Sequence, residues 1–241
     1  MKKIVAIALT LVMAGCGLAG CGQTTKETKT EAETAEAGAP QVAGGWTISE
    51  ACGAELPEEA KTAFDKALEG YAGMGFEPIT LLGTQVVAGI NYAILAKGTT
   101  VTATPETSLK VVIVYAGVDG TNEIRNVADF NIDEYTEDKD IDVKQLAGGW
   151  TVADTEGFAL PDDVQKAFDK AFEGFAGAGY TPLAFVGSQV VAGANYLVLC
   201  RETLVTAEPV TKLSMVKIYA DLQDSAEVTS VCAIDIADFN K

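Results

Sequence analysis

The sequence has no histidine, and this absence removes several kinds of catalytic site. Without an imidazole the chain builds neither a Ser-His-Asp triad nor a Cys-His pair. The spacings typical of zinc ligands and of phosphate-binding glycine loops are also missing. We therefore predict that the protein is not an enzyme and that it uses no metal and no cofactor.

Basic residues are few as well. Lys and Arg together number 17 against 34 Asp and Glu, which leaves a formal net charge of -17. Because a phosphate backbone repels such a chain, nucleic acid is excluded as a partner. The same surplus of carboxylates disfavours adhesion to anionic lipid headgroups. We therefore expect any membrane contact to depend on a separate anchor.

The N-terminus supplies a candidate anchor. An apolar run from Ile4 to Met13 follows two lysines and is too short to span a bilayer, which is typical of an export signal over residues 1–20. The residues Leu18-Ala19-Gly20-Cys21 resemble the lipobox of bacterial lipoproteins. This resemblance implies a diacylglycerol on Cys21 and attachment to the cell membrane on its extracytoplasmic side. Met13-Ala14-Gly15-Cys16 is a second candidate, and an ordinary secretory signal is the remaining alternative.

Residues 21–40 are mostly Thr, Glu, Lys, Ala and Gly with little to bury, which predicts a flexible tether. Beyond it lie three of the five cysteines, Cys52, Cys200 and Cys232, without metal or redox spacing. We expect the last two on strands separated by a third strand, too far apart for a disulfide.

The rest of the chain repeats itself at an offset of 104 residues. Gly44-Gly45-Trp46-Thr47 returns as Gly148-Gly149-Trp150-Thr151. This predicts two domains, at 41–132 and 145–241, joined by an acidic linker at 133–144. Asp129-Phe130-Asn131 is matched by Asp238-Phe239-Asn240 at an offset of 109, which predicts five extra residues before the last strand of the second copy.

Each copy has one amphipathic stretch followed by residues that alternate with a period of two. Pro57 and Pro161 suit the first position of a helix. The alternation predicts four strands in the first copy, after a short strand near Trp46. An antiparallel sheet with one helix across it follows, so the fold class is α+β with four or five strands per domain. The predicted strands are Pro78 to Ala88, Ile90 to Lys97, Leu109 to Ala116 and Glu123 to Ile132, and the helix stripes are Leu56, Ala60, Ala63, Phe64, Ala67, Leu68 and Tyr71 and then Leu160, Val164, Ala167, Phe168, Ala171, Phe172 and Phe175.

A pentapeptide between the second and third predicted strands resembles the Gln-x-Val-x-Gly turn of the cystatins, which inhibit papain-like cysteine proteases. The family also has glycines ahead of its helix, as Gly44-Gly45 and Gly148-Gly149 are here. The resemblance implies that this glycine trunk and the turn enter a protease cleft together. The matching turn residues are Gln85, Val86, Val87, Ala88 and Gly89 in the first copy and Gln189, Val190, Val191, Ala192 and Gly193 in the second.

The second hairpin departs from the family. Cystatins commonly place a Pro-Trp pair there, whereas this chain has residues 118–122 and about 221–227 without an aromatic side chain. Buried Trp often carries interface energy, so its absence weakens binding. Two hypotheses follow. One is a membrane-anchored inhibitor of papain-like cysteine proteases, and the other is a non-inhibitory binding or scaffolding lipoprotein with the same fold.

Overall fold

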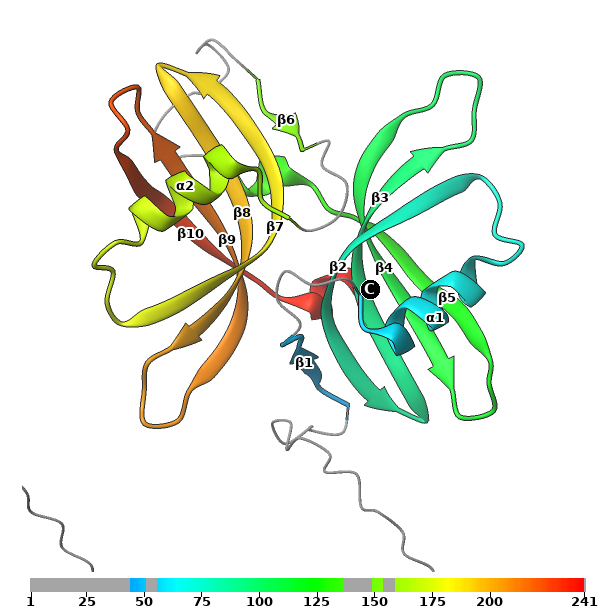
Figure 1. The fold of residues 1–241 in the computed structure, drawn as a ribbon. Helices are drawn as coiled ribbons and strands as arrows, with labels where there is room; N and C mark the ends of the chain where they lie inside the picture. The colour runs from blue at the N-terminus through cyan, green and yellow to red at the C-terminus, as the bar shows by residue number, and fades with distance from the viewer. Residues whose placement is uncertain (1–43, 51–55, 137–148, 154–158, 241) are drawn as a thin grey trace, which may run out of the picture. The chain divides into compact units, whose positions relative to one another are not determined.

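A computed structural model describes residues 44–50, 56–136, 149–153 and 159–240 (Figure 1). Several predicted features lie outside the described residues. They are the signal at 1–20, the tether, Cys16, Cys21, Cys52, Gly148 and the linker from residue 137 onward.

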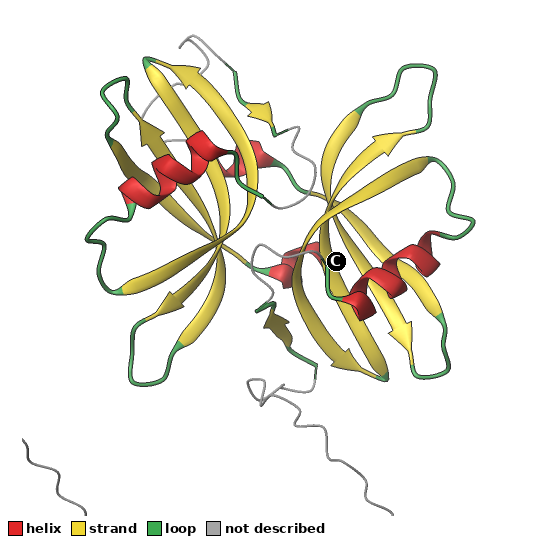
Figure 2. Ribbon diagram, in the orientation of Figure 1, coloured by secondary structure: helices red, strands yellow, loops and turns green. Residues whose placement is uncertain are grey.

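Each repeat consists of one α-helix and a five-stranded antiparallel sheet, which confirms the predicted α+β class (Figures 1 and 2). In both sheets the strands lie side by side in chain order, as expected for successive hairpins. Repeat 1 contains β1 (Trp46–Ile48), α1 (Glu58–Leu68), β2 (Met74–Val87), β3 (Gly89–Thr100), β4 (Thr107–Gly117), β5 (Asn122–Asp129) and the 3-10 helix η1 (Ile132–Tyr135). Repeat 2 contains β6 (Thr151–Val152), α2 (Asp162–Ala171), β7 (Ala178–Val191), β8 (Gly193–Leu204), β9 (Val210–Ala220), β10 (Ala226–Ile234) and the 3-10 helix η3 (Ile236–Asn240).

The helix covers one face of its own sheet. In α1 the apolar residues recur every three or four positions, and Ala60, Ala63 and Phe64 pack into a cluster with Ile94 and Val112. The matching cluster of repeat 2 is built on Val164, Ala167 and Phe168 of α2. Within each repeat, this burial positions the sheet beneath its helix.

Two details of the predicted helices were wrong. Pro57 and Pro161 stand at the N-cap, one position before the helix, rather than at its first residue. Tyr71 and Phe175 lie beyond the helix ends and are exposed, so they do not extend the buried stripes. In both repeats a glycine with positive φ, Gly70 or Gly174, turns the chain away before the aromatic residue reaches the core.

The opposite faces of the two sheets share one core. Leu95 and Ile113 of repeat 1 belong to the same buried cluster as Leu199 and Met215 of repeat 2. The 3-10 helices complete this core reciprocally. The Ile236 side chain of η3 lies against Gly83 of repeat 1, and the Ile132 side chain of η1 lies against Gly187 of repeat 2. The Phe130 and Phe239 rings also stack, with centroids 5.8 Å apart.

The predicted five-residue insertion is wrong. Asn122 pairs with Ala116, and Ala226 pairs with Ala220, so the two last hairpins have equal length. After the last strand, Asn131 Oδ1 accepts a hydrogen bond from the Asp133 N–H. Its counterpart at the same offset, Asp235 Oδ1, accepts one from the Ala237 N–H. Asp238-Phe239-Asn240 therefore corresponds to residues 134–136, and its likeness to residues 129–131 is coincidental.

The last strand of repeat 1 is shorter than predicted. It ends at Asp129 rather than Ile132, because the Asn131 side chain caps η1 and turns the chain. The cysteine prediction is confirmed for the two described residues. Cys200 on β8 and Cys232 on β10 are free thiols with β9 between them.

Candidate functional site

The predicted turn residues of repeat 1 lie at one end of its sheet. β2 ends at Val87 and β3 begins at Gly89, so Ala88 alone makes the bend. Trp46 of β1 pairs with Gln85 on one side, and Gly117 of β4 pairs with Gly89 on the other. Three segments therefore lie side by side at this end of the sheet (Figure 1). We call this end the tip. It consists of the trunk (44–46), the first turn (87–89) and the second turn (117–122).

Repeat 2 has an equivalent tip. Its first turn is Val191, Ala192 and Gly193, between β7 and β8, and its second turn is 221–226, between β9 and β10. Of its predicted trunk, Gly149 is described, and a Cβ added there would meet no atom within 4 Å.

Gln85 connects the segments of the first tip rather than facing outward. Its Nε2 donates to the Gly44 carbonyl oxygen at 2.9 Å, and its Oε1 accepts from Asn91 Nδ2 at 2.7 Å. The Gly44 N–H donates to the Val86 carbonyl oxygen at 3.2 Å. Trunk and first turn are thus held together before any partner arrives.

The second repeat has the same contact between glutamine and asparagine. Gln189 is only 6% exposed, and its Oε1 accepts from Asn195 Nδ2 at 2.7 Å. Both glutamines therefore help to position the tips, and Gln189 presents little surface to a partner.

A tyrosine that the sequence reasoning missed fixes each bend. The Tyr115 hydroxyl donates to the Ala88 carbonyl oxygen, and the Tyr219 hydroxyl donates to that of Ala192 at 2.7 Å. Fewer than half of the positions are identical between 44–136 and 148–240, yet this tyrosine and the cross-strand row that contains it are retained. The row consists of Gln85, Asn91, Tyr115 and Glu123 in repeat 1 and of Gln189, Asn195, Tyr219 and Glu227 in repeat 2. The recurrence of this tyrosine at the offset of 104 residues was the sequence feature that could have identified it.

Glycine is required at the end of each first turn. Gly89 has a φ of +131°, and a Cβ there would lie 2.3 Å from the Ala116 carbonyl oxygen. Gly193 has a φ of +124°, and its Cβ would lie 2.2 Å from the Ala220 carbonyl oxygen. Both the backbone conformation and the close approach of β4 or β9 exclude a side chain.

Aliphatic side chains project at both tips. Val87 of the first turn is 42% exposed, and Val118 at the apex of the second turn is 90% exposed. Leu222 occupies the apex in repeat 2 and is 78% exposed. The sequence shows that both second turns lack an aromatic residue, but the exposure of these aliphatic side chains, which are 104 residues apart, was not predicted from it.

The second turn of repeat 1 is held by its own backbone. The Gly117 N–H donates to the Thr121 carbonyl oxygen at 2.7 Å, and Asp119 Oδ1 accepts from the Thr121 N–H at 3.0 Å. This hydrogen bond lowers the pKa of Asp119. A charged carboxylate therefore keeps the turn closed around the exposed Val118.

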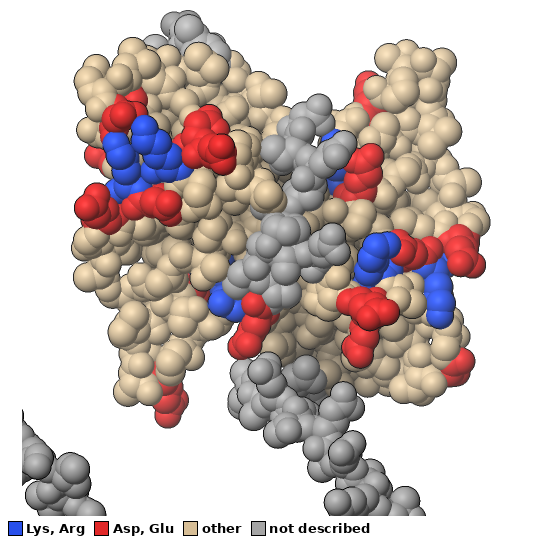
Figure 3. Space-filling model, viewed as in Figure 1, with Lys and Arg blue, Asp and Glu red and all other residues tan. Residues whose placement is uncertain are grey.

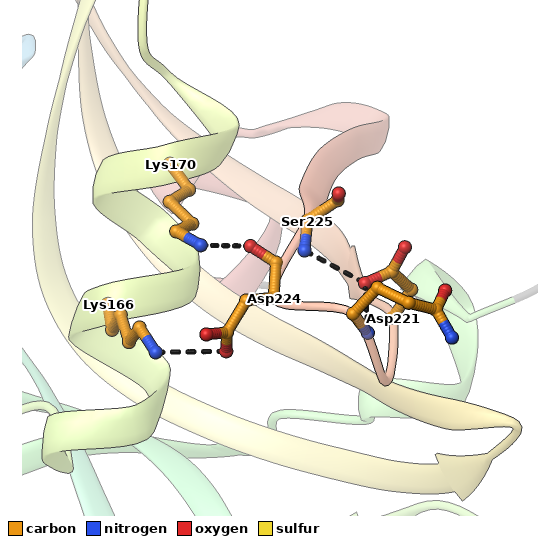
Figure 4. A network of polar contacts seen from close by, with 6 residues as sticks. Lys166, Lys170, Asp221, Asp224 and Ser225 are labelled. Carbon is orange, nitrogen blue, oxygen red and sulfur yellow. Dashed lines mark hydrogen bonds and ion pairs between the residues drawn. The ribbon is translucent and has the colours of Figure 1, made fainter.

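The second turn of repeat 2 is tied to the helix instead (Figure 4). Lys166 Nζ lies 2.9 Å from Asp224 Oδ1, and Lys170 Nζ donates to the Asp224 carbonyl oxygen. Asp224 has a φ of 67° and replaces Gly120, whose φ is 86°. The hydrogen bond from Lys166 lowers the pKa of the Asp224 carboxyl. Asp221 Oδ1 accepts from the Ser225 N–H at 2.8 Å and closes the same turn.

The charges on the face drawn in Figure 3 are mixed, since the basic groups there adjoin acidic ones. Among the described residues, no cluster of His, Cys, Asp or Glu is suited to hold a metal ion. None of the helices in those same ranges has the length and apolar character needed to cross a membrane.

Comparison of the sequence with protein-family models and with curated proteins finds no match.

Proposed function

We propose that the protein is a lipid-anchored, extracytoplasmic inhibitor of papain-like cysteine proteases that occludes the active-site cleft reversibly. One observation carries the proposal. In repeat 1 the trunk, the first turn and the second turn lie side by side at one end of the sheet, with Val87 and Val118 exposed. This is the order that the resemblance of Gln85–Gly89 to the cystatins implies. Each tip is therefore a candidate for insertion into a protease cleft.

The physical case rests on preorganisation. Gln85 and Tyr115 fix the first turn to its neighbours through hydrogen bonds. A rigid tip loses little conformational entropy on binding, so a modest contact area suffices for useful affinity. The small residues Ala88 and Gly89 allow the main chain to approach a narrow cleft closely.

The remaining features agree with a binding role at the membrane. The absence of histidine disfavours a catalytic triad, so we propose a protein that is not an enzyme. The acidic body needs a separate anchor, and acylation of Cys21 supplies about 0.8 kcal/mol per buried methylene. The tether at 21–40 then separates the tips from the lipid surface.

A titration of papain with residues 41–241 tests the proposal by following residual protease activity. We expect inhibition, and we expect the double variant Ala88→Arg with Ala192→Arg to abolish it, because it places a long cation on each exposed bend at a residue without positive φ. A matched control is Val101→Arg with Val205→Arg, which adds the same charge at exposed positions outside both tips. This control should inhibit like the parent chain.

The alternative is a non-inhibitory binding or scaffolding lipoprotein that uses the same fold. The lack of an aromatic side chain in both second turns favours it, because exposed Val118 and Leu222 bury less area than Trp. No inhibition of papain at tens of micromolar would support this alternative, whereas equal inhibition by the Ala88→Arg, Ala192→Arg variant would show that the tips are not the inhibitory surface.

A further inference from the structure

A groove of about 460 Å³ lies beside the first turn of repeat 1. It includes Val87 and Ala88, so a partner that covers this turn also borders the groove. Its remaining lining residues are Asn91, Tyr115, Arg125 and Asn240. The groove thus combines a cation, an aromatic ring and amide groups next to the first turn of repeat 1.

Arg125 is held in a fixed orientation. Its guanidinium carbon lies 4.5 Å from the centroid of the Tyr115 ring, and its Nη2 lies 2.7 Å from Glu123 Oε1. About half of the side chain remains exposed. A guanidinium carries five N–H donors in a planar fork, and stacking on the ring leaves the donor edges free of the aromatic face. Arg125 is therefore preorganised to receive a second carboxylate beside that of Glu123.

Asn91 contributes an unused acceptor. Its Nδ2 donates to Gln85, whereas its Oδ1 is buried with no hydrogen-bond partner. Leaving a buried acceptor unpaired costs about 1–3 kcal/mol. A peptide N–H would satisfy this oxygen once a small shift of the Asn91 side chain turns it toward the groove that the residue lines. The groove therefore offers a cation and, after this shift, an acceptor to one ligand.

In repeat 2 the position equivalent to Arg125 is Thr229, so that position carries no cation. The tip of this repeat carries Asp221, Asp224 and Glu227. Lys166 and Lys170 lie near that tip but contact Asp224. An incoming carboxylate would meet like charge there. The two tips have therefore diverged in charge while they retain the same hydrogen-bonded row.

We propose that the groove beside the first turn of repeat 1 binds an acidic side chain of an extended peptide segment of the partner. Arg125 receives the carboxylate, and Asn91 Oδ1 accepts a peptide N–H. Repeat 1 consequently prefers a partner with an acidic rim, and repeat 2 does not. That this partner is a protease rests on the proposed function, whereas binding of the acidic peptide does not.

The test is an NMR titration of the ¹⁵N-labelled chain with acetyl-Ala-Glu-Ala-amide and, separately, with acetyl-Ala-Gln-Ala-amide. We expect the glutamate peptide to shift the Asn91 side-chain amide and the Arg125 Nε–H signals, and to bind at least about fivefold more tightly than the glutamine peptide, a difference of about 1 kcal/mol. Arg125→Thr, which copies repeat 2, should remove this preference. Glu123→Gln should strengthen binding, because it removes the competing carboxylate.

Equal affinity for the two peptides, an undiminished preference in Arg125→Thr, or no shift with either peptide would overturn the subsite. A papain titration in the Ala192→Arg background, which blocks the exposed bend of repeat 2, separates this result from the proposed function. Peptide binding without inhibition would contradict only the protease proposal. Inhibition without acidic-peptide binding would contradict only the subsite.

Discussion

At the scale of single residues, Gly89 and Gly193 are the positions where the tips tolerate the least change. We predict that Gly89→Ala lowers the free energy of unfolding by about 2–4 kcal/mol, because left-handed strain adds to a clash with the Ala116 carbonyl oxygen. Urea unfolding measures this loss. Gly70→Ala is the control, since φ is also positive there but no atom lies within 4 Å, and it should cost only about 1 kcal/mol. Equal losses in the two variants would contradict the close approach.

The stability of the fold should decrease with pH in the alkaline range because of Tyr135. Burial raises the pKa of its hydroxyl to about 12, with smaller contributions from Glu134 and other neighbours. In the unfolded chain tyrosine ionises near pH 10. The folded state therefore binds this proton more tightly, and the resulting stability is complete below pH 10 and is lost as pH rises from 10 to 12.

Urea midpoints measured across this range should fall steeply in the parent chain and less steeply in Tyr135→Phe. Identical pH profiles would show that Tyr135 ionises as freely in the folded protein as in the unfolded one.

At the scale of elements, the two second turns solve the same backbone problem differently. Gly120 adopts positive φ at no steric cost, whereas Asp224 adopts it while Lys166 and Lys170 hold it. The exposed ion pair contributes little, and salt screens it.

We predict that Asp224→Gly unfolds at a slightly higher urea concentration than the parent chain, because the relief of positive-φ strain exceeds the small contribution of the exposed ion pair. Asp224→Ala should unfold earlier, since it loses the ion pair and keeps the strain. A clear loss in Asp224→Gly would show that the contact between this turn and α2 is the larger effect.

At the scale of the whole molecule, the core shared by the two sheets makes the repeats interdependent. Ile236 is 1% exposed and packs on the sheet of the other repeat, against Gly83. We predict that Ile236→Ala lowers the free energy of unfolding by about 2–4 kcal/mol. Because unfolding is expected to be cooperative, both repeats should respond.

Trp46 and Trp150 provide one fluorescent reporter in each repeat. In the single-tryptophan variants Trp46→Phe and Trp150→Phe, the transitions should coincide, and Ile236→Ala should shift both to lower urea. Separate transitions, or a shift of one reporter alone, would show that the repeats unfold independently.

The sequence alone determined the content of each repeat. Periods of 3.6 and 2 located α1 and the strands, because alternation reflects which residues face a core. The glycines and the pentapeptide located the first turns correctly. The roles of Gln85 and Tyr115 were beyond sequence reasoning, since their hydrogen bonds join strands that are distant along the chain.

Only the tertiary structure decided what covers each face of the sheets. A period of two separates the residues of a strand into two faces, but it does not say whether a helix, solvent or another sheet packs against either one. Here α1 covers one face of its sheet, and repeat 2 covers the other through Ile236 and its neighbours. The reciprocal contacts of Ile132 and Ile236 also show that η1 and η3 are equivalent elements. The identical tripeptides at 129–131 and 238–240 had obscured this equivalence in the sequence.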